Sequence, residues 1–403
     1  MNRNLEKLHP YPFEKLNALL EGVSNKANMP LIAWSVGEPK HPAPDFLVEA
    51  LSNESVIRQG FGAYPPTRGL PELRDAISDF LARRYSLHER PDPETQVLPV
   101  TGTREALFSF ANAVLTPTDD SVTVMPNPFY QIYEGAALLA GSEPHYVNCS
   151  GIDLTPDFDS VPNDIWQRCQ LLYLCSPGNP TGGVLSADKL GELIKLSDEH
   201  GFIIAADECY SEIYLDESDP PPGLLEVASA LGRHDYRNCI AFNSLSKRSN
   251  LPGLRSGYVT GDARILEKFL LYRTYQGAAM PVHHQLLSAM AWQDEHHVRE
   301  NREIYRSKFK TVVGILNTVW PMETPRAGFY LWPETPMDDQ MFTRRLIEET
   351  SIKVIPGSFL SRDTKTGNPG TNRVRMALVA TEAECIEAAE RIVDHWEALT
   401  AVS

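Results

Sequence analysis

The sequence predicts an α/β fold in which a mostly parallel sheet is covered on both faces by helices. Several short runs are apolar without a break, as is typical of strands buried on both faces. These predicted strands are Ser121–Met125, Gln170–Cys175, Phe202–Ala206, Cys239–Phe242 and Gly257–Thr260. Between them, apolar residues recur at helical spacing, as at Leu73, Ile77, Phe80 and Leu81 and at Ala106, Leu107, Phe110 and Val114. Such strand–helix alternation indicates a doubly covered sheet.

The last part of the chain has a different pattern, which predicts a smaller α+β domain. A long helix is expected over about Asp294–Thr318, followed by strands near 328–332, 352–355 and 373–378. A closing helix is opened by Thr381 and Glu384, which form a capping-box pattern. We therefore expect a large α/β domain over residues 46–290 and a smaller domain made of residues 1–45 with 291–403.

Composition and charge exclude several classes of function. The formal net charge of the 403 residues is -16, which argues against nucleic acid or an anionic membrane surface as a partner. Met1–Tyr11 has no apolar segment typical of a secretory signal, and no apolar run approaches the ~18 residues that a membrane span needs. The six cysteines are scattered without a C-x-x-C pair, as expected for reduced cytoplasmic thiols.

No metal is expected either. The paired histidines His283-His284 and His296-His297 are adjacent in sequence. Adjacent residues on a helix point about 100° apart, which is poor ligand geometry.

The segment Ser244–Gly257 carries the strongest functional signal, because it sets Lys247 among small hydroxyl residues and glycines. It follows the apolar strand 239–242, so the lysine is expected to be at least half-buried. A buried lysine loses its charge readily and becomes a nucleophile able to form a Schiff base. Arg255, eight residues further on, keeps its charge and suits a phosphate. The alternative is a solvated lysine in a flexible loop.

The other predicted strands are also followed by polar or glycine-rich turns, at the edge where open α/β sheets bind ligands. Gly102-Thr103-Arg104 opens a helix whose free N–H groups would suit a phosphate. Tyr130, on a proline-stiffened turn, could stack on a flat ring or simply pack in the core. Asn179 lies in a turn dense in proline and glycine.

Asp207 ends a buried strand, where a carboxylate is costly unless it meets a cation. That cation is either a protonated pyridine nitrogen or an arginine of an internal salt bridge. Tyr210, three residues on, could reach a ring hydroxyl.

Together these residues match the aldehyde, ring and phosphate of pyridoxal 5′-phosphate. Their order and spacing resemble the fold-type I, class I/II aminotransferases over about residues 31–380. The resemblance implies that Lys247 forms the Schiff base and shuttles the substrate proton, that Asp207 holds the pyridine nitrogen and that Tyr130 stacks on the ring. It also implies that Asn179 and Tyr210 bind the ring oxygen. The implied phosphate ligands are Gly102, Thr103, Arg104, Ser244, Arg255 and, more weakly, Ser246. The large domain would then be the cofactor-binding one.

The same resemblance supplies substrate and partner residues. Tyr64 looks like the tyrosine that a neighbouring subunit lends to the phosphate site, which implies a homodimer with shared active sites. Gly37 of Gly37-Glu38-Pro39 would lie by the substrate α-carboxylate, together with Asn179. Arg375 looks like the arginine that clamps that carboxylate, and Arg373 is the competing choice. The reaction implied is ping-pong transamination between an amino acid and a 2-oxo acid.

Two further segments resemble the proteobacterial N-succinyl-L,L-diaminopimelate aminotransferases of lysine biosynthesis. One is Pro10–Leu16, which leads a predicted helix with Phe13, Leu16, Leu20 and Val23 on one face; the other is the Asn368-Pro369-Gly370 insertion. Such a substrate carries a distant succinyl carboxylate, for which Arg68, Arg248 and Arg362 are candidate ligands. The alternatives are another aminotransferase (aspartate, methionine or aromatic), a carbon–sulfur lyase, and a non-catalytic regulator, which would need a basic DNA-binding module that residues 1–45 lack.

Overall fold

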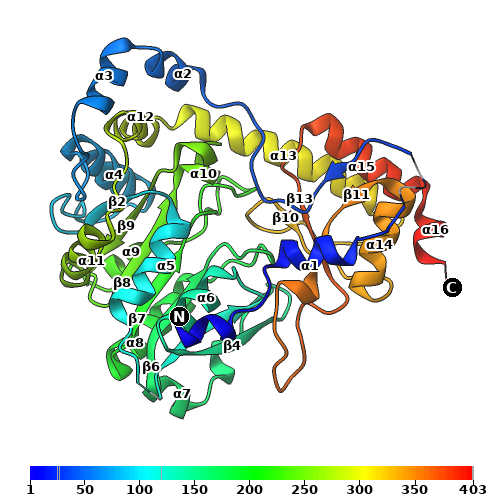
Figure 1. Ribbon diagram of the computed structural model, residues 1–403, viewed down its shortest axis with the longest axis horizontal. Coiled ribbons are helices and arrows are strands. Elements are labelled where there is room, and N and C mark those ends of the chain that lie inside the picture. The colour runs from blue at the N-terminus through cyan, green and yellow to red at the C-terminus, as the bar shows by residue number, and fades with distance from the viewer. Residues whose placement is uncertain (25, 27, 119, 402–403) are drawn as a thin grey trace.

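The computed structural model describes residues 1–401 apart from 25, 27 and 119, and its dominant feature is a large mixed sheet (Figure 1). Within the described residues this sheet has eight strands in the order β2-β9-β8-β7-β6-β3-β4-β5. Neighbouring strands from β8 through β7, β6 and β3 to β4 are parallel, whereas β2–β9, β8–β9 and β4–β5 pair antiparallel. The bounds are β2 Val97–Val100, β3 Val122–Asn127, β4 Glu143–Ser150, β5 Thr155–Pro156, β6 Cys169–Cys175, β7 Ile203–Asp207, β8 Cys239–Ser244 and β9 Gly257–Gly261.

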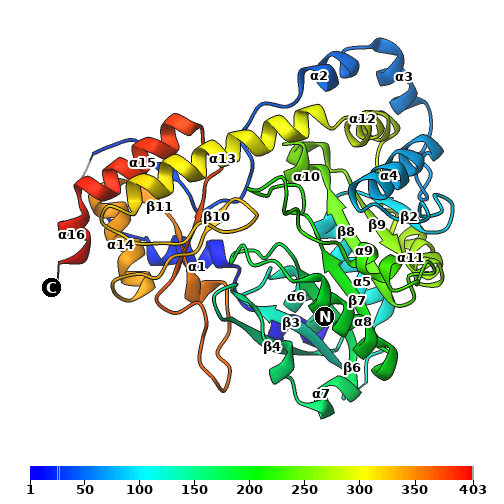
Figure 2. The same cartoon turned by 180° about the vertical axis from the view of Figure 1, so that it is seen from behind.

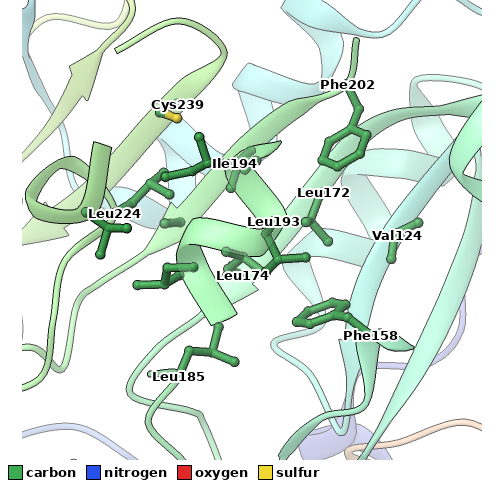
Figure 3. Close-up of a cluster of buried hydrophobic side chains, with 14 of the residues drawn as sticks. Val124, Phe158, Leu172, Leu174, Leu185, Leu193, Ile194, Phe202, Leu224 and Cys239 are labelled. Atoms are coloured by element: carbon green, nitrogen blue, oxygen red, sulfur yellow. The ribbon is translucent and has the colours of Figure 1, made fainter. Parts of the chain in front are cut away.

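Alternate residues of the central strands are buried on opposite faces of this sheet. Leu172 and Leu174 of β6 pack in one core with Leu193 and Ile194 of the helix α8 (Ala187–His200), as Figure 3 shows. Tyr173, between them, belongs to a second core on the other face. Because both faces are covered, every position of β6 tolerates an apolar residue, which explains its unbroken apolar run. The predicted fold class is confirmed.

Helices of the large α/β unit pack on both sides of the sheet (Figures 1 and 2). α8 and α9 contribute to the first core, and α5, α6 and α11 to the second. The bounds are α2 Asp45–Leu51, α3 Glu54–Gly62, α4 Pro71–Arg84, α5 Thr103–Val114, α6 Ile132–Leu139, α7 Asn163–Arg168, α8 Ala187–His200, α9 Leu224–Ala230, α10 Leu245–Arg248, α11 Ala263–Gln276 and α12 Val282–Gln293. Short 3-10 turns lie at Phe158–Ser160 and Pro252–Leu254.

The C-terminal part forms a second core with residues from the start of the chain. Trp34 is fully buried there beside Phe309, Phe342 and Met376. Strands β10 Tyr330–Leu331, β13 Val374–Ala377 and β12 Ile355–Pro356 pair antiparallel, and β1 Ile32–Ala33 pairs parallel with β11 Ile352–Lys353. The helices are α13 His296–Leu316, α14 Asp339–Thr350, α15 Glu382–Asp394 and α16 Trp396–Thr400, with a 3-10 turn at Gly357–Phe359. The division at residues 45 and 290 stays a prediction.

Two local predictions have different outcomes. The capping box forms, since the Thr381 hydroxyl accepts from the Glu384 N–H and the Glu384 carboxylate accepts from the Thr381 N–H. The N-terminal helix α1 Pro12–Leu19, which follows the 3-10 turn Arg3–Lys7, is shorter than the pattern predicts. It stops before Leu20 and Val23, where the chain turns at Gly22 with a φ of 73°. None of the described helices is both long and apolar enough to span a membrane.

Candidate active site

A cavity of about 410 Å³ opens where the parallel strands of the large sheet end. Cys175, Asp207 and Ser244 end β6, β7 and β8 and contribute to its wall. The predicted residues that line it are Gly37, Thr103, Arg104, Tyr130, Asn179, Asp207, Tyr210, Ser244, Ser246, Lys247, Arg255 and Arg375. Gly102 lies against Arg255, which lines the cavity, whereas Tyr64 is fully exposed and does not line it. The structure thus brings together all of the predicted site residues except Tyr64.

Lys247 projects into the cavity from α10, the short helix that follows β8. Its amine donates to the carbonyl oxygen of Gly37, and it lies 5.1 Å from the centre of the Phe329 ring. Burial lowers the pKa of the Lys247 amine to about 8. At mildly alkaline pH a large fraction of such an amine is uncharged and can act as a nucleophile, unlike the amine of a solvated lysine.

The turn before α5 and the loop around Arg255 place several hydrogen-bond donors next to one another, and we call this group the donor cradle. Gly102 has a φ of 91°, which favours glycine, and a Cβ at this position would lie 2.3 Å from Nη2 of Arg255. The arginine therefore lies directly across the first turn of α5, where the backbone N–H groups have no helical partner. Ser244 and Thr103 face the same cavity. A helix start, an arginine and hydroxyl groups together suit a phosphate.

Asp207 is a buried carboxylate that points into the cavity from the end of β7. Its Oδ2 accepts a 2.7 Å hydrogen bond from the Tyr133 hydroxyl, and its Oδ1 accepts from the backbone N–H of Cys209 at 3.2 Å. Burial raises the pKa of Asp207, and those hydrogen bonds oppose the rise. Within the described part of the chain no arginine pairs with Asp207, so the alternative of an internal Asp207–arginine salt bridge is wrong.

Arg375 reaches the cavity from β13 and is buried. Nη1 donates to Oδ1 of Asn179 at 3.1 Å and Nη2 to the carbonyl oxygen of Ser35 at 2.7 Å, but the buried Nε has no hydrogen-bond partner among the described residues. Arg373, by contrast, lies before β13 and pairs with Glu334 at 2.6 Å. Of the two arginines only Arg375 lines the cavity, and it keeps donor capacity for an anionic ligand.

Comparison with known proteins identifies the family. Residues 29–392 match the family model for aminotransferase class I and II. The chain belongs to this family. It is 30% identical over 397 residues to an LL-diaminopimelate aminotransferase of Desulforudis audaxviator, covering 97% of this chain and 96% of that protein.

Solved structures of aminotransferases are similar along the whole chain. The crystal structure of an aminotransferase from Neisseria meningitidis has 48% sequence identity and a TM-score of 0.93, covering 98% of this chain and 99% of that one. A probable N-succinyldiaminopimelate aminotransferase from Thermus thermophilus has 26% identity and a TM-score of 0.83, covering 95% and 99%. The predicted fold type, the enzyme class and the pyridoxal 5′-phosphate cofactor are confirmed at the level of the family.

The cavity of this aminotransferase fits that cofactor on its own chemistry. Among the described residues no arginine pairs with the buried Asp207 carboxylate, which suits a protonated pyridine nitrogen, and a lysine with a lowered pKa suits the aldehyde. The donor cradle of Gly102, Thr103 and Arg255 suits the phosphate. The individual roles of these residues stay predictions.

The three arginines predicted as ligands of a succinyl group are held elsewhere. Arg68 donates to the carbonyl oxygen of Glu94 and lines a separate cavity. Arg248 is fully buried and bonds to the carbonyl oxygen of Ala291 and to the Glu295 carboxylate, both at 2.7 Å. Arg362 makes two hydrogen bonds to the Glu134 carboxylate, at 2.8 and 2.6 Å. None of the three lines the aminotransferase cavity formed by the described residues.

The sequence interpretation missed several residues of this site. Tyr133 bonds to Asp207, and its position three residues after Tyr130 is a signal that could have found it. Cys209 lies 3.1 Å from the Thr103 hydroxyl, next to the predicted Asp207. Tyr330 and Tyr11 also line the cavity, but they come from segments whose approach to the sheet no local pattern encodes.

Proposed function

We propose that this aminotransferase moves the amino group between N-succinyl-L,L-2,6-diaminopimelate and 2-oxoglutarate, giving N-succinyl-2-amino-6-oxopimelate and glutamate. This is a step of lysine and diaminopimelate biosynthesis, which we assign to the cytoplasm. Support comes from the Pro10–Leu16 and Asn368–Gly370 segments and from the similarity to the probable N-succinyldiaminopimelate aminotransferase of Thermus thermophilus.

The observation that carries the proposal is a cation of the cavity, Arg104, that pairs with no carboxylate among the described residues; the resemblance implied it as a phosphate ligand, and we propose it instead as a substrate ligand. Its Nε donates to the Tyr130 hydroxyl at 2.7 Å, and no carboxylate within the described residues pairs with it. The apolar side chains Phe13, Val36, Ile355 and Leu360 line the same cavity. A substrate with an α-carboxylate at Arg375, an aliphatic chain on the apolar side chains and a second carboxylate at Arg104 would match this arrangement.

Each residue of the site would have a separate task in this reaction. Arg375 would bind the substrate α-carboxylate with its planar fork, and Asn179 would help to hold it. When bound, the pyridoxal 5′-phosphate would withdraw electrons from the substrate α-carbon. The amine of Lys247 would take the proton from that α-carbon, because burial keeps its pKa near 8. Asp207 would stay ionised against the pyridine nitrogen, aided by the Tyr133 hydroxyl.

We also propose that two copies of the chain share their active sites. The Tyr64 side chain is 99% exposed and does not line the cavity of its own chain. The exposed Tyr64 side chain is therefore accessible to a second copy of the chain. Tyr64 would then complete the phosphate site of a second copy, and sedimentation of the purified protein would have to give twice the mass of one chain.

A second candidate substrate is unmodified L,L-diaminopimelate, the compound named for the similar aminotransferases of Desulforudis audaxviator and Nitratidesulfovibrio vulgaris. The carboxylate of Glu38 lines the cavity and could receive the distal ammonium of that compound. N-succinylation removes this ammonium and supplies a carboxylate instead, so the two candidates require opposite charges at the far end of the substrate.

The test is a panel of amino donors with 2-oxoglutarate as acceptor. We expect kcat/KM for N-succinyl-L,L-diaminopimelate to exceed that for L,L-diaminopimelate, aspartate, methionine and kynurenine. A preference for L,L-diaminopimelate would select the second candidate. Pyruvate released from cystathionine without any acceptor would instead identify a lyase. Lys247→Arg is the matched inactive control, and turnover in that variant would contradict the assignment of Lys247.

A further inference from the structure

Tyr330 is a buried residue of β10 whose hydroxyl lies 3.0 Å from the hydroxyl of Tyr210. β10 lies beside β13 (Figure 1) and pairs antiparallel with it. Tyr330 therefore stands opposite Ala377, two residues beyond Arg375. Tyr210 belongs to the loop after β7 of the large sheet. The hydroxyl pair therefore joins the small antiparallel sheet to the edge of the large one, inside the cavity that both tyrosines line.

Tyr330 also touches two other parts of the site. The Arg375 guanidinium lies 4.6 Å from the centre of the Tyr330 ring. A Cβ added to Gly37 would lie 2.0 Å from the Tyr330 hydroxyl oxygen, so the glycine makes room for that hydroxyl. The carbonyl oxygen of the same Gly37 accepts from Lys247. The ring of Tyr330 thus contacts Arg375, whereas its hydroxyl contacts Tyr210 and Gly37. A substitution that removes only the hydroxyl leaves the ring contact in place.

The direction of the hydrogen bond between the two tyrosines follows from counting hydrogens. A tyrosine hydroxyl has one hydrogen to donate. If Tyr210 donates it to the ring oxygen of the cofactor, as its proposed role requires, only Tyr330 can supply the hydrogen between the two hydroxyls. Burial raises the pKa of both phenols, so both keep their hydrogens at neutral pH.

We propose that Tyr330 is a positioning residue that donates its hydroxyl hydrogen to Tyr210 and thereby strengthens the hydrogen bond from Tyr210 to the cofactor ring oxygen. The proposal rests on the proposed role of Tyr210. Hydrogen bonds in a chain polarise one another, so a donor behind Tyr210 makes Tyr210 a better donor. A stronger donor stabilises the anionic form of the ring oxygen.

The consequence is a shift in the titration of the bound cofactor. The midpoint pH at which its visible absorbance band changes should rise when the support from Tyr330 is lost, because the ring oxygen then holds its negative charge less well. The other titratable or charged groups that face the pair are Arg375, Lys247, Cys175, Tyr11 and Glu38. Tyr330→Phe leaves all of these in place and removes one oxygen atom.

The experiment measures absorbance against pH for the enzyme loaded with its cofactor. In Tyr330→Phe we expect the midpoint to rise by about half a pH unit to one unit. Tyr305→Phe is the matched control, since Tyr305 is equally buried, stacks on Phe329 next to Tyr330, and has a hydroxyl without a hydrogen-bond partner among the described residues. Its midpoint should stay that of the unaltered enzyme.

A double-substitution cycle separates this inference from the role of Tyr210. Tyr210→Phe should raise the midpoint further than Tyr330→Phe, and adding Tyr330→Phe to it should change nothing more. An unmoved midpoint in Tyr330→Phe, or an equal shift with and without Tyr210, would overturn the inference while leaving the role of Tyr210 intact. An unmoved midpoint in Tyr210→Phe would overturn both.

Discussion

The guanidinium of Arg375 donates a hydrogen bond to the side-chain oxygen of Asn179, with 3.1 Å between the two atoms. Arg375 comes from the small antiparallel sheet, whereas Asn179 comes from the turn after β6 of the large one. The proposed ligand of the substrate carboxylate and the proposed ligand of the cofactor ring oxygen are therefore fixed relative to each other.

Replacing Arg375 with lysine should lower kcat/KM by about 100-fold, mainly through KM, because an ammonium cannot reproduce the two parallel hydrogen bonds of a guanidinium to a carboxylate. Steady-state kinetics with varied amino donor would measure the change. Arg373→Lys is the control on the same segment, since Arg373 pairs with Glu334 outside the cavity. A larger effect in the control would mean that Arg373 is the carboxylate ligand.

Lys247→Met should stabilise the cofactor-free protein at neutral pH. The folded-state pKa of Lys247 is lowered from 10.5 to about 8, so the unfolded chain binds more protons between these values. The stability of the unaltered protein therefore rises with pH across this window, and below pH 8 the buried charge costs about 3 kcal/mol. The free energy of unfolding of Lys247→Met should exceed that of the unaltered protein by about 3 kcal/mol at pH 7. This difference should vanish by about pH 10.5.

Urea unfolding at several pH values checks this, with the exposed Lys268→Met as control. A pH-independent difference between Lys247→Met and the unaltered protein would show that the amine does not titrate as expected.

Arg104→Leu should impair only donors with a second carboxylate. We expect KM for N-succinyl-L,L-diaminopimelate to rise about 10-fold, because a partly exposed charged hydrogen bond is lost. KM for methionine should change less than about twofold. The control is the surface variant Arg326→Leu, because the guanidinium of Arg326 pairs with Asp219. Equal losses for both donors would assign Arg104 to the cofactor rather than to the substrate.

Arg362→Met should destabilise the fold without changing substrate preference. It removes the arginine partner of the buried Glu134 carboxylate and leaves the Tyr146 hydroxyl and His9 as its neighbours, which costs about 3 kcal/mol. Adding Glu134→Gln should recover much of the loss, as urea unfolding of the single and double variants would show. If KM for the succinylated donor instead rose while stability stayed constant, Arg362 would be a substrate ligand after all.

Much of the fold and part of the site could be predicted because they depend on local patterns. The apolar run of β6 reflects burial on both faces, and Lys247 and Asp207 follow strands that end at one edge of the sheet. The partners of Arg362 and Tyr330 depend on contacts between residues more than a hundred positions apart. In sequence Arg362 is simply a basic residue near a motif, and only its approach to Glu134 removes it from the list of substrate ligands.

The position of α1 has a practical consequence. Tyr11, Pro12 and Phe13 line the cavity, and Leu16 of the same helix packs with Trp332 and Ile355 from the C-terminal part of the chain. Figure 1 shows this first helix lying between the two larger bodies of the molecule. Any tag, truncation or fusion that disturbs residues 11–16 therefore alters the substrate cavity itself, and kinetics measured on such a protein would describe a different enzyme.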